Sequence, residues 1–184
     1  KGMTHEQLFE NLVYFLIGVM PACKETGINM AIHPDDPPWD IFDLPRIVGR
    51  EEDYDRLFKV VPNPHNGITF CTGSLGAGRF NDLAKMAGKY AKRIYFAHLR
   101  QLKFTNDTDF YENGHQTKDG NVDIYAIVKA LTEGGFDGYV RPDHGRNIWG
   151  EDGKPGYGLY DRALGACYLS GLFEAIEKER IWKN

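Results

Sequence analysis

Four short apolar runs alternate with helical patterns along this chain, and this alternation constrains the fold more than any other feature of the sequence. The runs cover residues 28–34, 67–73, 94–100 and 138–145. Each is rich in β-branched and aromatic residues and is bounded by Gly, Pro or Asp, which is typical of a strand. Because the runs are almost continuously apolar, they predict parallel strands that are buried on both faces.

Five helical patterns lie before, between and after these strands. They cover residues 4–27, 51–61, 81–93, 123–133 and 158–180. Thr4 and Gln7 predict a capping box for the first helix, Gly27 predicts its end, and Asn81 predicts the N-cap of the third. One helix followed by four strand–helix units predicts an α/β fold with a parallel sheet and right-handed crossovers.

Four strand–helix units make half of a (β/α)8 barrel, which needs eight strands and usually about 250 residues. The chain has 184 residues and begins within a helical pattern, without an initiator Met. We therefore expect residues 1–184 to be the C-terminal half of a single TIM-barrel domain, with the absent N-terminal half of the same protein as their partner. The alternative is a complete small open sheet of four or five strands.

Composition excludes several classes of function. A hydrophobic fraction of 42% and a net charge of −4 are typical of a globular domain. No basic run supports nucleic-acid binding, and the longest uncharged apolar stretch, residues 12–23, is too short to span a membrane. Three widely spaced cysteines do not form a disulfide framework, so we expect a cytoplasmic protein.

Four candidate metal ligands lie at or near the C-terminal ends of the predicted strands: His33, Cys71, His98 and Asp143. One ligand per strand–helix unit suits a barrel, whereas the ligands of a zinc finger come in close pairs. Taken alone, Cys71 is more often a small buried hydrophobic residue than a ligand, but its position at a strand end favours a ligand. Imidazole and thiolate favour Zn²⁺, Fe²⁺ or Co²⁺ and the carboxylate admits Mn²⁺, so the ligand types leave the metal open.

The segment RPDHG is the strongest single signal. Arg141, Asp143 and His144 follow an apolar strand, where burying such groups without partners or function is costly. The glycine-rich segment after Cys71 predicts a turn that could cradle an anion, although its spacing matches no Walker or dinucleotide motif.

Several motifs together resemble the mannonate dehydratases of the UxuA type. They are HPDDPP at 33–38, FCTGS at 70–74, HLR at 98–100, DGNVDIYAIVKAL at 119–131, RPDHG at 141–145 and PGYGLYDRALG at 155–165. HPDDPP and RPDHG are specific in combination, and the resemblance extends over nearly the whole chain. It implies a barrel of the xylose-isomerase-like type and a lyase that dehydrates D-mannonate to 2-keto-3-deoxy-D-gluconate in hexuronate (glucuronate) catabolism. It also implies Mn²⁺ or Fe²⁺ as cofactor and assembly into a homo-oligomer.

The resemblance also assigns roles to residues. It implies that the metal ligands are His33, Cys71, His98 and Asp143, and that the essential active-site residues are Arg141, His144 and Tyr157. The PGY motif places Tyr157, and Tyr160 is its nearest rival.

Each of these residue types has a role in the elimination of water from a sugar acid. A divalent cation stabilises the enediolate, a base removes the C2 proton, and an acid protonates the departing C3 hydroxyl. We assign the base and the acid to His144 and Tyr157 without deciding between them. Arg141 either binds the substrate carboxylate or holds Asp143 in place. Further candidates for substrate contacts, with solvated loop charges as the alternative, are Asp35, Asp36 and Arg100.

Two other functions fit part of the pattern. A metal-dependent sugar isomerase or epimerase on the same barrel would typically use more carboxylate ligands, so Cys71 and the RPDHG segment speak against it. A non-catalytic metal or sugar-acid binding module would bind without turnover. The long polar segment 103–120 predicts a functional loop, either a lid over the pocket or a subunit contact.

Overall fold

A four-stranded parallel sheet forms the centre of the computed structural model, which describes residues 2–107 and 109–182. Its strands, in spatial order, are β1 (Met30–Ile32), β2 (Asn66–Cys71), β3 (Ile94–His98) and β6 (Tyr139–Arg141). All three neighbouring pairs are parallel. The predicted strands and their parallel pairing are confirmed, although each strand is shorter than its apolar run.

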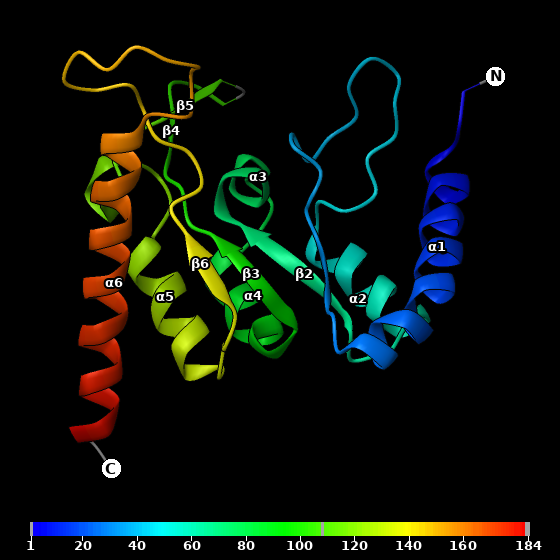
Figure 1. The fold of residues 1–184 in the computed structure, drawn as a ribbon. Coiled ribbons are helices and arrows are strands. Elements are labelled where there is room, and N and C mark those ends of the chain that lie inside the picture. The colour runs from blue at the N-terminus through cyan, green and yellow to red at the C-terminus, as the bar shows by residue number, and fades with distance from the viewer. Residues whose placement is uncertain (1, 108, 183–184) are drawn as a thin grey trace.

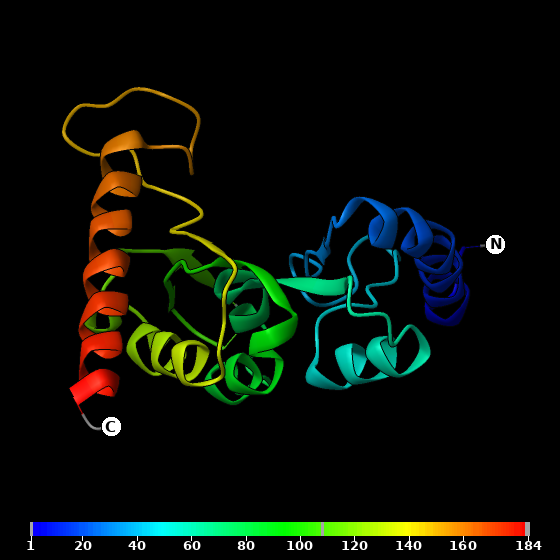
Figure 2. The same ribbon diagram turned by 60° about the horizontal axis from the view of Figure 1, so that its bottom comes forward.

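Six α-helices accompany the sheet in the described part of the chain. They are α1 (His5–Thr26), α2 (Glu51–Val60), α3 (Thr72–Ala77), α4 (Leu83–Tyr90), α5 (Ile124–Glu133) and α6 (Leu159–Trp182). Figures 1 and 2 place α4 and α5 side by side against one face of the sheet, with α6 alongside α5 and α1 at the far end next to α2. The loops that follow β1, β3 and β6 gather at the upper end of the sheet in Figure 1, where the strands end.

The predicted start of α1 is confirmed, and that of α4 is wrong. Thr4 and Gln7 form the capping box of α1. The N-cap of α4 is Asp82, whose side chain accepts from the Lys85 amide. The side-chain amide of Asn81 instead donates to the backbone carbonyls of Gly49 and Leu75.

Three elements were not predicted: the helix α3 and the strands β4 and β5. The glycine-rich segment after β2 is the short helix α3 and not a turn. The polar segment expected to be a loop contains an antiparallel hairpin of β4 (Leu102–Phe104) and β5 (Phe110–Glu112).

The hydrophobic core lies between the sheet and α4, α5 and α6. All six residues of β2 are buried, and Phe70 at its centre is fully buried. The prediction that the strands are buried on both faces is therefore confirmed for β2 and wrong for β1 and β6, whose residues are partly or largely exposed. These two strands form the edges of the sheet, so each has a neighbour on one side only. Of the helices in the described part of the chain, none combines the length and apolar character that a bilayer span requires.

Candidate metal centre

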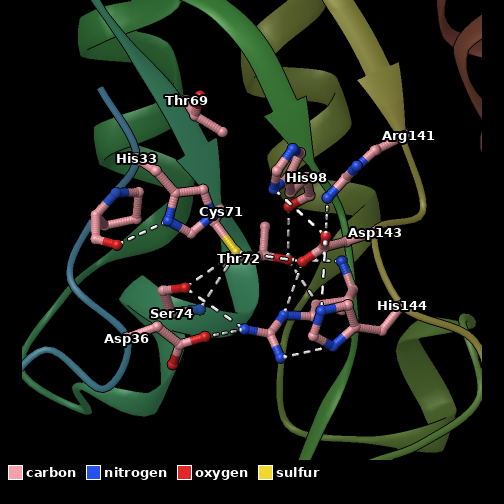
Figure 3. A network of polar contacts seen from close by, with 12 residues as sticks. His33, Asp36, Thr69, Cys71, Thr72, Ser74, His98, Arg141, Asp143 and His144 are labelled. Atoms are coloured by element: carbon pink, nitrogen blue, oxygen red, sulfur yellow. Dashed lines mark hydrogen bonds and ion pairs between the residues drawn. The ribbon is translucent and has the colours of Figure 1, made fainter. Parts of the chain in front are cut away.

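Three predicted ligands from three adjacent strands converge at the C-terminal end of the sheet (Figure 3). Cys71 and His98 end β2 and β3 and are register partners, and His33 follows β1 directly. One side-chain donor atom of each lies within 4.8 Å of those of the other two. Parallel pairing brings these strand ends to one place, as the sequence predicted.

Asp143, the fourth predicted ligand, reaches the same place from the segment after β6. Its φ of 65° is left-handed, a conformation that aspartate adopts more readily than most residues. The Asp143 carboxylate is buried, accepts a hydrogen bond from Cys71 Sγ at 3.6 Å, and has its Oδ1 3.4 Å from His98 Nδ1. The carboxylate of Asp143 therefore lies beside two of the three converging ligands, Cys71 and His98.

The histidines fit a bound cation. Within residues 2–107 and 109–182, neither ring nitrogen of buried His98 makes a hydrogen bond, although Nδ1 has the ion-pair contact with Asp143. Leaving a buried polar group without a partner is costly, and a cation bound there would remove that cost. His33 Nδ1 lies 2.7 Å from the Pro34 carbonyl, which can only accept, so Nδ1 carries the proton and Nε2 is free to bind a metal.

The thiol of Cys71 is also prepared for metal binding. Burial raises its pKa, but the imidazoles of His33 and His98 and the charge of Arg100 lower that pKa to about 6. The thiolate, which is the form that binds metals, therefore predominates at neutral pH. Two imidazoles, a thiolate and a carboxylate are a donor set that suits a divalent transition metal.

Arg100 lies buried at the centre of three carboxylates. Its Nε is 3.0 Å from Asp143 Oδ2, its Nη2 is 2.6 Å from Asp36 Oδ2, and its Nη1 donates to Glu112 Oε1. Burial raises the pKa of Asp143, but cationic neighbours that include Arg100 lower it below its usual value. The Arg100 side chain leaves no space for a side chain at Gly73, where a Cβ would lie 2.0 Å from Arg100 Nε.

The aspartates after β1 differ in their surroundings. The Asp35 carboxylate accepts from the backbone amides of Ile47 and Val48 at 2.7 and 2.9 Å, so its geometry favours a structural role. Asp36 points towards Arg100 at the site (Figure 3).

The three predicted active-site residues lie next to this cluster. Arg141 Nη2 donates to Asp143 Oδ1 at 2.6 Å, and its side chain is about half exposed. The ring of His144 lies 6.2 Å from that of half-exposed Tyr157. Tyr160, the alternative to Tyr157, instead packs against Trp149 in a tilted arrangement with the ring centroids 5.8 Å apart.

Glu112 is the residue at this site that the sequence did not reveal. Its Oε1 lies 2.5 Å from His144 Nδ1, and this hydrogen bond raises the pKa of His144 despite the opposing effect of burial. Burial raises the pKa of Glu112, but His144 and Arg100 lower it below its usual value, so Glu112 is ionised. No sequence signal singles it out, because it lies in a polar segment that looked like a loop.

Comparison with known proteins gives a consistent result. Residues 1–183 match the family model described as D-mannonate dehydratase. A mannonate dehydratase of Thermotoga petrophila is 55% identical over 180 residues, which are 97% of this chain and 50% of that protein. The crystal structure of mannonate dehydratase from Streptococcus suis serotype 2 has a TM-score of 0.93 at 44% identity and matches 98% of this chain and 52% of that one.

A more distant structure shares the fold alone. The xylose isomerase domain protein from Planctomyces limnophilus has a TM-score of 0.65 at 15% identity, over 92% of this chain and 55% of its own. This chain spans about half the length of the curated relatives that it matches. The family match covers nearly the whole chain, and we conclude that the chain belongs to the mannonate dehydratase family.

Proposed function

We propose that the protein containing this chain dehydrates D-mannonate to 2-keto-3-deoxy-D-gluconate and water, in the cytoplasmic breakdown of hexuronates. The observation that carries this proposal is the cluster around His98. Both ring nitrogens of His98 are buried and make no hydrogen bond among the described residues. They lie near three other potential metal ligands, the side chains of His33, Cys71 and Asp143, in a chain of the mannonate dehydratase family.

Four residues would hold the metal in this proposal: His33, Cys71, His98 and Asp143. The donor set admits either Mn²⁺ or Fe²⁺. Once bound, such a cation supplies Lewis-acid stabilisation of the negative charge that builds up on the substrate during elimination.

The proton transfers belong to His144 and Tyr157. One of them takes the C2 proton, the C2–H electrons form the double bond to C3, and the C3–O bond breaks. The other gives a proton to the departing oxygen, which leaves as water. The enol that remains then gains a proton at C3 and loses the proton of its C2 hydroxyl, which gives the 2-keto-3-deoxy acid. Their neighbouring rings let both reach one bound substrate.

In this proposal, cationic side chains at the edge of the metal centre bind the sugar acid. One nitrogen of Arg141 is used by Asp143, and the exposed remainder of this guanidinium is free to pair with the substrate carboxylate. Asp36 and Arg100 remain candidates for contacts to substrate hydroxyl groups, whereas Asp35 is engaged by backbone amides.

We also propose that residues 1–184 form the C-terminal half of a TIM barrel. Two observations support this: the chain spans about half of its relatives, and the edge strands β1 and β6 each have one free side in the described structure. The remaining strands of the protein would pair with those edges, as a closed barrel requires. Assembly into a homo-oligomer is part of the same proposal.

The test uses the full-length protein with D-mannonate and a divalent metal. We expect a 2-keto-3-deoxy acid as product, whereas an epimerase would give an isomeric aldonic acid without loss of water and a binding module would give no product. His144→Asn should lose most turnover. The control is His65→Asn, whose imidazole lies beside Asn29 at the opposite end of the sheet. Absence of the product from metal-loaded protein, or near-normal turnover of His144→Asn, would contradict the proposal.

A further inference from the structure

Glu112 reaches the site from outside the parallel sheet. It is the last residue of β5 and lies opposite Leu102 in the β4–β5 hairpin. Its Oε1 oxygen lies 2.5 Å from His144 Nδ1, and the same oxygen accepts a hydrogen bond from Arg100 Nη1. One carboxylate oxygen thus contacts the proposed catalytic histidine and the buried arginine at once.

The hairpin holds Glu112 in a fixed place. Buried Gln101, which precedes β4, donates from Nε2 to the carbonyls of Gln116 and Val122 at 3.2 and 2.8 Å. Its Oε1 accepts from the amides of Leu102 and Val122 at 3.1 and 2.7 Å. These bonds join both ends of the segment to one side chain, so Glu112 is presented by a braced hairpin and not by a free loop.

The contacts of His144 Nδ1 decide where the ring carries its proton. Arg100 Nη1, which can only donate, lies 3.3 Å from Nδ1, and the ionised Glu112, which can only accept, lies 2.5 Å away. The closer contact and the negative charge favour a proton on Nδ1 that is donated to Glu112. The proton and the guanidinium then share one acceptor oxygen.

The other ring nitrogen points towards the candidate metal centre. His144 Nε2 is 3.9 Å from Asp143 Oδ1, and Figure 3 shows the imidazole beside that carboxylate. With Nδ1 occupied by Glu112, only Nε2 is available to a substrate bound at the cluster.

We propose that Glu112 is the positioning residue of His144: its carboxylate holds the imidazole with a proton on Nδ1 and thereby reserves Nε2 for proton exchange with the sugar acid. The part played by His144 rests on the proposed function, whereas the Glu112–His144 contact does not. As a base, Nε2 uses its lone pair to take the C2 proton, and the ring becomes an imidazolium. As an acid, the imidazolium gives its Nε2 proton to the departing hydroxyl group and returns to the neutral form.

A different role for Glu112 would be to neutralise Arg100 only. Two substitutions separate the roles, because both contacts fall on Oε1. In Glu112→Gln the amide oxygen can still accept from His144 and Arg100, but the negative charge is lost. In Glu112→Ala both the acceptor and the charge are lost.

The experiment measures kcat, KM and metal content of these variants in the full-length protein with D-mannonate. Glu112→Ala should lower kcat by about 10- to 100-fold, as loss of a partner that orients a histidine commonly does, with little change in KM and in bound metal. Glu112→Gln should recover most of that loss. Asp107→Ala is the matched control, because this carboxylate on the same hairpin is exposed and pairs with Arg79 away from the site.

A kcat of Glu112→Ala within about twofold of the wild type, or equal losses in the Ala and Gln variants, would overturn the proposal. A crystal structure of the full-length Glu112→Ala variant supplies a readout that needs no turnover. We expect the His144 ring to turn away from Asp143, and an unmoved ring would also overturn the proposal. If the wild-type protein makes no 2-keto-3-deoxy acid, the proposed function fails, and the ring position still tests the hold of Glu112 on His144.

Discussion

Replacing Gly73 with alanine should destabilise the protein, although it replaces a helical glycine with the best helix former. A Cβ at this position would lie 2.0 Å from Arg100 Nε and 2.4 Å from Arg100 Cζ, whereas non-bonded heavy atoms pack at about 3.5 Å or more. Arg100 would have to move by about 1.5 Å, given that packing distance. That shift breaks its ion pairs with Asp36, Asp143 and Glu112.

The expected cost follows from these contacts. Overpacking alone costs about 1–3 kcal/mol, breaking a buried ion pair costs about 3–5 kcal/mol, and the gain in helix propensity is at most about 1 kcal/mol. Because Arg100 can relax partly, we expect Gly73→Ala to lower the free energy of unfolding by about 2–4 kcal/mol. Urea denaturation of the full-length protein, followed by circular dichroism, measures this.

Gly88 in α4 provides the matched control. A Cβ there meets no atom closer than 3.8 Å, so Gly88→Ala should stabilise the protein by about 0.5–1 kcal/mol. If Gly73→Ala proved as stable as Gly88→Ala, Arg100 would not be packed against Gly73, and the buried arginine network would be wrong.

Two further predictions concern the loop after β6 and its contact with the first turn of α6. Tyr157→Phe should lower kcat by about 10²- to 10⁴-fold, the usual contribution of a general acid or base. The kcat of the control variant Tyr160→Phe should stay within a few-fold of the wild-type value. Similar losses of kcat in both variants would remove Tyr157 from the mechanism. Burial raises the pKa of Asp161, but hydrogen bonds from Arg146 lower this pKa below its usual value. The ionised Asp161 therefore stabilises the fold fully above the unfolded-state pKa of about 3.9. This stabilisation is lost as the pH falls through the lower folded-state pKa. The difference in melting temperature between wild type and Asp161→Asn should therefore be full at pH 6 and shrink below about pH 4; a difference that is constant with pH would contradict this origin.

The parts of the fold set by local pattern were predictable from the sequence. Each strand is a compact apolar run that ends at a polar residue, so the strands and the residues at their ends could be found together. Parallel pairing then brought His33, Cys71 and His98 to one point without further information.

The parts set by tertiary contact were not predictable. α3 contains two glycines, which disfavour a helix, and one of them is required by the position of Arg100, a residue 27 positions further along the chain. The β4–β5 hairpin is braced by the buried amide of Gln101, whose partners lie on both sides of the hairpin. Glu112 was missed for the same reason, since its role depends on a register that no periodicity reveals.

The measurement that tests the account most directly is a crystal structure of the full-length protein with anomalous diffraction at the manganese and iron edges. It should show one divalent cation per chain, ligated by His33, Cys71, His98 and Asp143, with a Cys71 sulfur bond of about 2.3–2.5 Å, near the value for zinc thiolates. A fully active protein without a metal at this position, or a cation held elsewhere with His98 unligated, would contradict the account.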